Sequence, residues 1–214
     1  MPAVKEAFSR LWPEARLMNL LDDSLSPDLV EAGEINASLT ERFCDLALYA
    51  KRTSADGILY TCSAFGPAID VARGVVGLPV LKPNEAMFEA ALDVCAALRR
   101  PGRVGLVSTF AASVPSMRDE LFSVAESRGL AVSLSVECPQ GALEALGRGD
   151  ARTHDLLVSA AANKLLSCDV LMLGQFSMAH LRGRIAEETS LAVLSSPDSA
   201  VHMLKQAILG QPAT

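Results

Sequence analysis

The 214-residue chain lacks several features that would place a protein in a familiar class. No apolar run approaches the roughly 18 residues that a membrane span needs. The formal net charge of -6 gives no reason to expect nucleic acid or an anionic membrane as a partner. The first twelve residues mix charged with apolar positions, so we expect no signal peptide. These absences predict a soluble, cytoplasmic protein.

Cysteine is present, but not in a pattern typical of a metal site or a disulfide framework. The five cysteines lie far apart, with no CxxC and no Cys/His pair at ligand spacing, and the three histidines are equally scattered. The odd number of cysteines also disfavours disulfide pairing. We therefore expect no bound metal. The cysteines are Cys44, Cys62, Cys95, Cys138 and Cys168.

Short apolar segments alternate along the chain with amphipathic ones. The predicted strands are 15–21, 57–61, 78–81, 103–108, 131–136, 169–174 and 191–195. The predicted helices are 3–10, 37–53, 84–98, 114–127, 154–167, 177–187 and 198–209. The most polar connections are 22–36 and 147–153. This alternation predicts an α/β fold with mostly parallel, helix-covered sheets.

Two parts of the chain resemble each other at one fixed offset. DGILYTCSAFG (56–66) aligns with DVLMLGQFSMA (169–179), 113 residues later, as measured from Asp56 to Asp169. The same offset aligns the apolar residues of 78–81 with those of 191–194, and Pro2 with Pro115. Several matches in the same order predict two similar α/β lobes. We expect an N-terminal lobe of 1–82 plus 197–214 and a C-terminal lobe of 83–196.

The repeat also predicts a gap in the first lobe. Segment 103–108 opens the second copy, and its counterpart at the same offset would precede residue 1. Either the chain as given starts late, or this lobe tolerates a shorter sheet. We therefore expect its sheet to be one strand shorter than that of the second lobe. An opening strand would lie between 15–21 and 57–61, so we expect these two segments not to pair directly.

The ends of the predicted strands indicate where a ligand binds. In open parallel sheets, ligands bind beyond the carboxyl ends of the strands. Residues 62–64 and 175–177 occupy equivalent strand ends, and 108–110 form a third. The first two lead into helices, whose free N–H groups favour an anion. We expect a small anionic ligand, most simply a carboxylate, in a cleft between the lobes.

Cys62 is the candidate reactive group of this cleft. A thiol beside a helix N-terminus has a depressed pKa and can act as a base, an acid or a nucleophile. The alternative is a small buried residue, because free cysteine is among the most buried residue types. The position of Cys62 at a repeated strand end favours the functional interpretation. The other four cysteines are predicted to pack in the core.

Four segments resemble the aspartate/glutamate racemase superfamily, which includes maleate isomerases and arylmalonate decarboxylases. They are TCSAFGP (61–67), LPVLKPNEAM (78–87), LGQFSMA (173–179) and SSPDSA (195–200). The resemblance covers nearly the whole chain, without the family's first strand. It implies two lobes related by a pseudo-twofold axis, with the active site in the cleft between them. It also implies no metal or organic cofactor, a small carboxylate substrate and a homo-oligomer.

The resemblance assigns residues to roles. In the racemases each lobe supplies one cysteine, and the two face opposite sides of the substrate's α-carbon. Cys62 matches the first cysteine, whereas the second position is Gln175. An amide has no acid or base form near neutral pH, so Gln175 can only hydrogen-bond a carboxylate or enolate oxygen. We expect the Cys62 and Gln175 side chains to face each other across the cleft.

The predicted substrate-binding residues all lie at the strand ends. They are Ser63, Ala64, Ser108, Thr109, Gln175, Phe176 and Ser177. For the serines and the threonine, capping of the following helices remains an alternative.

Three functions stay open from the sequence. The first is a racemase-like enzyme that transfers a proton next to a carboxylate through Cys62. The second is a decarboxylase of a malonate-like acid, in which Cys62 protonates the enediolate after carbon dioxide leaves. In the single-cysteine arylmalonate decarboxylases, however, the thiol belongs to the other lobe. The third is a non-catalytic protein that binds a small carboxylate.

Overall fold

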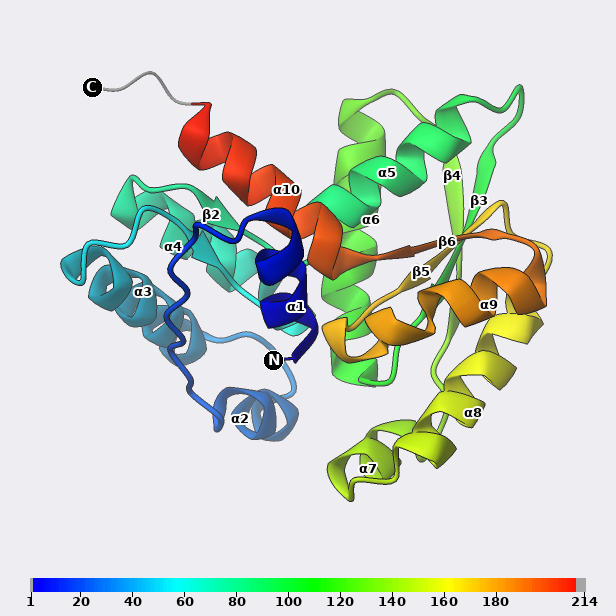
Figure 1. The fold of residues 1–214 in the computed structure, drawn as a ribbon, viewed down its shortest axis with the longest axis horizontal. Coiled ribbons are helices and arrows are strands. Elements are labelled where there is room, and N and C mark those ends of the chain that lie inside the picture. The colour runs from blue at the N-terminus through cyan, green and yellow to red at the C-terminus, as the bar shows by residue number, and fades with distance from the viewer. Residues whose placement is uncertain (1, 211–214) are drawn as a thin grey trace.

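The strands form two separate parallel sheets, one in each lobe. The computed structural model describes residues 2–210 and shows the two lobes side by side (Figure 1). The first sheet pairs β1 (Ile58–Leu59) with β2 (Val80–Leu81). The second has the order β4-β3-β5-β6, with β3 (Gly102–Val107), β4 (Val132–Glu137), β5 (Val170–Leu173) and β6 (Ala192–Ser195). The predicted α/β fold with parallel sheets is confirmed.

Helices cover these sheets. The first half of the chain contains α1 (Pro2–Leu11), α2 (Leu25–Ala32), α3 (Ala37–Arg52), the short 3-10 helix η1 (Ser63–Phe65), α4 (Gly66–Val76) and α5 (Glu85–Ala96). The second half contains η2 (Ala111–Ser113), α6 (Val114–Ser127), α7 (Ala142–Gly147), α8 (Ala151–Ala162), η3 (Asn163–Leu165), η4 (Phe176–Leu181), α9 (Arg182–Thr189) and α10 (Ser196–Leu209). Within residues 2–210, no helix is both long and apolar enough to cross a bilayer.

Local chemistry accounts for several helix ends. The Asn36 side chain accepts a hydrogen bond from the Leu39 N–H at 2.9 Å and caps the start of α3. Lys51 and Arg52 in its last turn complement the helix dipole. α4 begins with Pro67 in its first turn and ends at Gly77, whose φ of 63° suits glycine.

The 113-residue repeat is visible in the order of the elements. The series β1, η1, α4, β2, α5 corresponds to β5, η4, α9, β6, α10. α5 buries Met87 and Phe88 against the second sheet, whereas α10 packs with α1 in a cluster that includes Phe8 and Leu204. Each of these helices therefore follows the last strand of one lobe and covers the other. The lobe boundaries predicted at 82/83 and 196/197 coincide with these crossings, but remain a prediction.

The predicted strand 15–21 is wrong, because this segment has no regular structure. A strand needs a neighbour for its backbone groups, and β1 pairs with β2 alone among the described residues. Met18 and Leu21 are 76% and 83% exposed instead of buried on a sheet. The first sheet is consequently two strands shorter than the second, not one. As expected, 15–21 and 57–61 do not pair.

Two connections also contain helices that the sequence did not predict. Within 22–36, α2 buries Leu25 and Leu29, which lie one helical turn apart. Pro27 and the neighbouring aspartates make this connection polar, a composition typical of a loop. The second unpredicted helix is α7 (Ala142–Gly147), which lies between a predicted strand and a predicted helix. α8 begins at Ala151, slightly before its predicted start, and Asp150 caps it by accepting a hydrogen bond from the Thr153 N–H at 3.0 Å. The remaining helices begin and end within a few residues of their predicted ranges.

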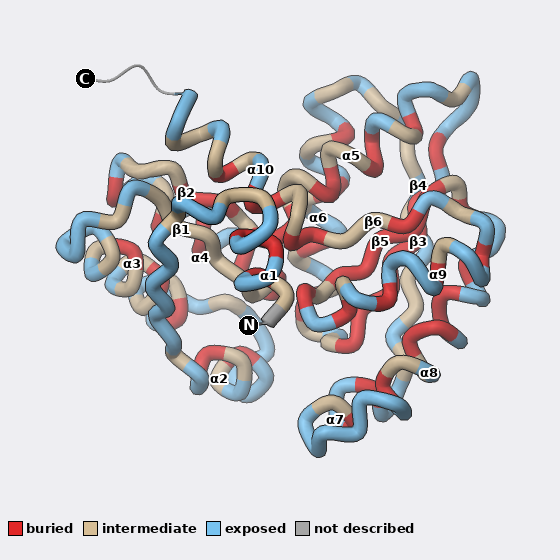
Figure 2. The backbone as a smooth tube through the Cα atoms, viewed as in Figure 1, coloured by how far each residue is buried: buried red, intermediate tan, exposed pale blue. Residues whose placement is uncertain are grey.

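β3 and β5, the central strands of the second sheet, are buried almost throughout (Figure 2). An ion-pair cluster lies at one end of these two strands. Asp169 immediately precedes β5 and accepts hydrogen bonds from the Arg100 guanidinium at 2.5 and 2.9 Å. It also accepts from the Arg103 backbone N–H at 2.8 Å. These bonds, with Arg100 first, hold the pKa of Asp169 well below its usual range. Asp169 thus ties the starts of β3 and β5 together.

We predict that Asp169→Asn lowers the melting temperature at pH 7 by more than it does at acidic pH. A depressed carboxyl pKa stabilises the fold above the pKa of the unfolded chain, near 4, and this stabilisation is lost as pH falls. Circular dichroism melts across this range test the prediction. The exposed Asp119→Asn serves as a control, and an equal loss at every pH would contradict the role of the Asp169 charge.

Candidate functional site

The three predicted strand ends come together near the boundary between the lobes. Phe110 and Ala112, from the loop after β3, pack against the first-lobe cluster that contains Ala64 and Phe65. The same loop is hydrogen-bonded to Gln175, after β5, through the backbone N–H of Thr109 at 2.8 Å. The loop of residues 108–113 therefore connects the other two strand ends.

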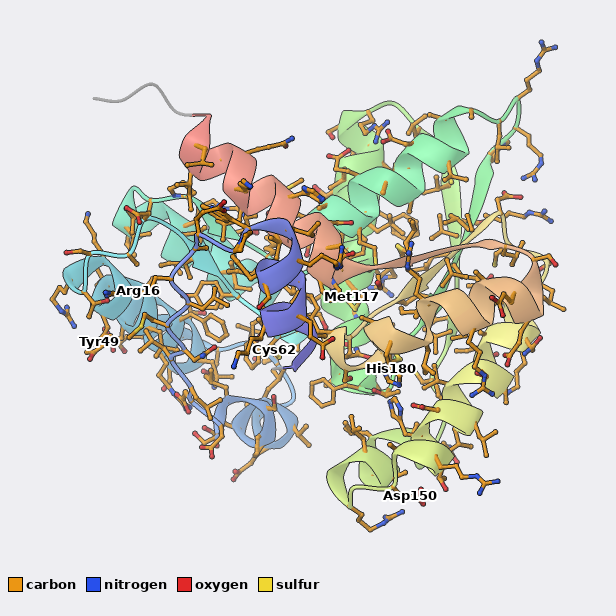
Figure 3. All side chains as sticks on the ribbon, viewed as in Figure 1. Arg16, Tyr49, Cys62, Met117, Asp150 and His180 are labelled. Carbon is orange, nitrogen blue, oxygen red and sulfur yellow. The ribbon has the colours of Figure 1, made fainter. Side chains whose placement is uncertain are left out.

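Cys62 lies at the centre of the molecule, close to where the lobes meet (Figure 3). It precedes η1 with extended backbone angles (φ -106°, ψ 116°) and is only partly exposed. Burial raises the pKa of its thiol, while hydrogen bonds from the Ala64 backbone and the Ser26 side chain act in the opposite direction. The expected depressed pKa is thus wrong, because desolvation outweighs both hydrogen bonds. The thiol of Cys62 is therefore neutral near pH 7.

Gln175 occupies the equivalent position after β5, with similar extended angles (φ -124°, ψ 144°). Its Oε1 accepts from the N–H and the hydroxyl of Thr109 at 2.8 and 3.3 Å. Its Nε2 donates to the Ser108 and Ser113 hydroxyl oxygens at 2.9 and 3.2 Å. The amide is therefore fully engaged within its own lobe. That Gln175 also faces Cys62 across a cleft stays a prediction.

Gly174, which immediately precedes Gln175, allows the backbone at this strand end to pack closely against α6 and β3. A Cβ on Gly174 would lie 3.0 Å from the Met117 side chain and 3.2 Å from the Val107 carbonyl oxygen. Any larger residue would push Gln175 away from the loop that it bonds.

The other predicted binding residues differ in how they are placed. Ser63 and Ala64 are buried in η1, and Thr109 is buried beside Gln175. Ser108 has no exposed surface, and its hydroxyl bonds to Phe110 and Ser113 within the same loop. As the chain is folded here, Ser108 stabilises the loop and does not face solvent.

The two residues after Gln175 differ in their environments. Phe176 packs against the cluster formed by α1 and α10, whereas Ser177 is exposed. Contact of either residue with a substrate remains a prediction. Phe176 already has a structural function, because it extends from the second lobe into a cluster that belongs mainly to the first.

Sequence reasoning missed Ser26 and Glu120. Ser26 lies in a stretch predicted as a loop, so no sequence pattern indicated its influence on the pKa of Cys62.

Glu120 lies on α6, one turn beyond Ser116. The Ser116 hydroxyl accepts a hydrogen bond from the Gly66 N–H at 3.1 Å. A Cβ on Gly66 would lie 2.7 Å from Ser116 Oγ and 3.5 Å from Glu120 Oε2. The amphipathic pattern of α6 gives no sign that Glu120 faces α4.

Glu120 has an unusual environment at this contact between α4 and α6. Its Oε1 is buried and has no hydrogen-bond partner in the described structure. Burial raises its pKa to about 7, although the nearby Lys82 opposes this shift. The Lys82 ammonium is itself paired with Asp70 at 2.8 Å. The carboxyl of Glu120 therefore changes charge near neutral pH.

No group of three or more His, Cys, Asp or Glu side chains among the described residues is arranged to hold a metal. A surface groove of about 530 Å³ runs along α3 and includes none of the predicted site residues. Its lining residues include Leu20, Asp22, Arg42 and Tyr49.

Comparisons with known proteins agree on the fold. A family model described as Asp/Glu/Hydantoin racemase matches residues 1–204. The structure of a glutamate racemase isoform from Bacillus anthracis is 16% identical, with a TM-score of 0.70 over 96% of this chain and 77% of its own. Allantoin racemase from Klebsiella pneumoniae is 22% identical, with a TM-score of 0.60 over 82% of this chain and 69% of its own.

An arylmalonate decarboxylase has a similar structure as well. It is 17% identical, with a TM-score of 0.61 over 96% of this chain and 87% of its own. No curated protein sequence matches this chain. The likeness to these structures establishes the two-lobe α/β fold.

We predict that Gln175→Leu destabilises the protein by about 2 kcal/mol or more, because it leaves the buried Thr109 N–H unpaired, at about 1–3 kcal/mol, and removes the hydrogen bonds to Ser108 and Ser113. The groups left without the amide are the Thr109 N–H and the hydroxyls of Ser108 and Ser113. Urea unfolding measures the loss. The exposed Ser177→Ala should change stability by no more than about 0.5 kcal/mol. Equal stability of wild type and Gln175→Leu would rule out the structural role of the amide.

We also predict that Glu120→Gln is more stable than wild type at pH 8, and that the difference disappears near pH 4. A carboxyl whose pKa is raised in the fold costs stability as pH rises from its unfolded pKa through about 7, on the order of 3 kcal/mol in total. Thermal melts at both pH values test this. Glu126→Gln, an exposed change on the same helix, is the matched control, and a pH-independent difference would contradict the prediction.

Proposed function

The chain belongs to the Asp/Glu/hydantoin racemase family, and on this basis we propose that it is an enzyme that transfers a proton at a carbon next to a carboxylate, with Cys62 as the proton-transfer group. One observation carries the proposal. Cys62 lies at a strand end beside the lobe boundary, and hydrogen bonding with the Ala64 backbone and the Ser26 side chain lowers the pKa of its thiol against the effect of burial. Such a thiol can give up a proton and be stabilised as a thiolate.

The proposed step conserves protons and electrons. The electron pair on the substrate's α-carbon is left either when the C–H bond breaks and the proton passes to the Cys62 thiolate, or when the bond to a carboxylate breaks and carbon dioxide leaves. This pair is delocalised into the adjacent carboxylate as an enediolate. The Cys62 S–H bond breaks, the α-carbon gains the proton, and the thiolate keeps the sulfur electron pair. Hydrogen bonds from Ala64 N–H and Ser26 Oγ–H stabilise this thiolate. A proton from solvent or from the next substrate restores the thiol.

Two-base racemisation does not fit this site. It needs a second acid or base on the opposite face of the α-carbon, and Gln175 stands at the equivalent strand end. Its amide cannot titrate near neutral pH, and its donors and acceptor already bind the loop of residues 108–113. In this proposal Gln175 helps to shape the pocket, and Cys62 alone moves protons. Ser63, Ala64, Thr109 and Ser177 are proposed as substrate contacts.

A decarboxylase of a malonate-like acid is the second candidate, and the protonation state of Cys62 favours it. A decarboxylase needs one proton donor, because the electron pair on the α-carbon comes from the departing carboxylate. The raised pKa keeps Cys62 protonated and ready to donate near neutral pH. The similar arylmalonate decarboxylase structure shows that this fold occurs in an enzyme of that class.

We predict that Cys62→Ser lowers turnover by about 10²-fold or more, the contribution expected of a general acid–base group. The assay uses glutamate, aspartate and arylmalonates in deuterated water, with mass spectrometry of substrate and product. Cys138 is exposed, so its predicted place in the core is wrong, and Cys138→Ser should retain full activity. Unchanged activity of Cys62→Ser on any substrate turned over by the wild type would contradict the proposal.

The position of the deuterium separates the candidates. A racemase-like enzyme introduces deuterium into recovered substrate, whereas a decarboxylase introduces it only into the product. Saturable binding of a carboxylate, with no deuterium in either, would instead show a non-catalytic binding protein.

A further inference from the structure

We propose that the exposed face of α3, together with the neighbouring segment 15–21, binds the same surface of a second copy of this chain around a two-fold axis near Tyr49. This surface is remote from the candidate active site, and the proposal does not depend on the chemistry of Cys62. Tyr49 lies at the outer edge of the first lobe, whereas Cys62 lies at the centre of the molecule (Figure 3).

Segment 15–21 is apolar but is not covered by the rest of the chain. Its pattern predicts a buried strand, yet four of its apolar side chains are exposed, namely Leu17, Met18, Leu20 and Leu21. Single exposed apolar residues are common on folded proteins, whereas a group of them marks an interaction surface. The segment therefore offers apolar surface to a partner.

The same segment and α3 line one groove, of about 530 Å³. Leu20 from the segment and Tyr49 from α3 both contribute to its lining. Directly after the segment, Asp22 Oδ2 accepts a hydrogen bond from the Arg42 Nε at 2.9 Å, which ties this part of the chain to α3. A partner that packs on α3 at this groove therefore also contacts apolar side chains of the segment.

The exposed face of α3 carries charges that complement each other when the helix meets a second copy of itself. Asp45, Tyr49 and Arg52 follow at intervals of four and three residues and line the same groove, so they form one stripe along the helix. The Arg52 guanidinium lies over the Tyr49 ring, 5.9 Å from its centre. The acid thus lies one turn before the tyrosine and the base one turn after it.

This order of charges selects an antiparallel arrangement of the two helices. With the axis near Tyr49, each Asp45 lies opposite the partner's Arg52, and the two tyrosines meet at the centre. A parallel arrangement would instead place like charges against each other, which opposes association. The antiparallel contact uses the same patch on both copies, so it closes as a dimer.

The two charged residues have no competing partner of opposite charge. Within residues 2–210, neither Asp45 nor Arg52 forms an ion pair. Arg42 also lines the groove, but its guanidinium is already paired with Asp22 and Asp28. Asp45 and Arg52 are therefore the charges of this groove that a second copy can neutralise, and they fix its register on α3.

Sedimentation equilibrium from about 0.1 to about 100 μM protein measures the dissociation constant of the proposed dimer. We expect Asp45→Arg and Arg52→Asp each to raise it about tenfold or more, because each change brings like charges together at both contacts. Glu126→Arg reverses the charge of an exposed residue on α6 and should leave it unchanged. A monomer at every concentration, or equal dissociation constants for all three variants, would overturn the proposal.

A mixture of the two variants tests the antiparallel arrangement. When Asp45→Arg and Arg52→Asp proteins are mixed in equal amounts, opposite charges again meet at both contacts of a heterodimer. We expect the mixture to associate with a dissociation constant within about threefold of that of the wild type. Recovery requires both variants to be folded, so misfolding cannot produce it. A mixture that associates no better than its separate components would contradict the proposed contact.

Discussion

The hydrogen bonds of Gln175 are the constraint on which the candidate site depends. The Gln175 amide joins the end of β5 to the loop after β3, and that loop packs against the first-lobe strand end that carries Cys62. Two strand ends of one sheet and one of another are thereby fixed relative to each other. Because these bonds occupy the N–H groups and the carbonyl oxygen of the amide, the amide has no free group to bind a ligand. Gln175 is thus built into the structure, and the two halves of the candidate site are chemically unequal.

Opposing effects on a single sulfur set the chemistry of Cys62. Burial excludes water and favours the neutral thiol, whereas two neutral donors favour the thiolate. The balance yields a thiol that is protonated near neutral pH but stabilised once it has lost its proton. Such a group is better suited to donating a proton than to attacking as a nucleophile. This is why the structure is compatible with protonation of an enediolate by one residue.

The two lobes are held together by elements that cross between them. α5 and α10 each follow the last strand of one sheet and cover the other lobe, and Phe176 extends into the cluster of α1 and α10. At the contact of α4 with α6, Gly66 lets Ser116 and Glu120 approach closely. Glu120 introduces a titratable, unpaired oxygen into this packed contact. The contact between α4 and α6 therefore contains a carboxyl group whose pKa burial raises to about 7.

The sequence by itself determined the α/β class, the repeat and the prominence of Cys62 and Gln175, because period-two and period-3.6 patterns and strand-end motifs are local properties. The tertiary structure alone decided the rest. Segment 15–21 has a strand-like sequence but lacks a neighbour to pair with. The pKa of Cys62 is raised because burial, which depends on the whole fold, outweighs the local helix start. Ser26, whose side chain lowers the pKa of Cys62 against the effect of burial, lies far from Cys62 in the chain, and no local pattern encodes such proximity.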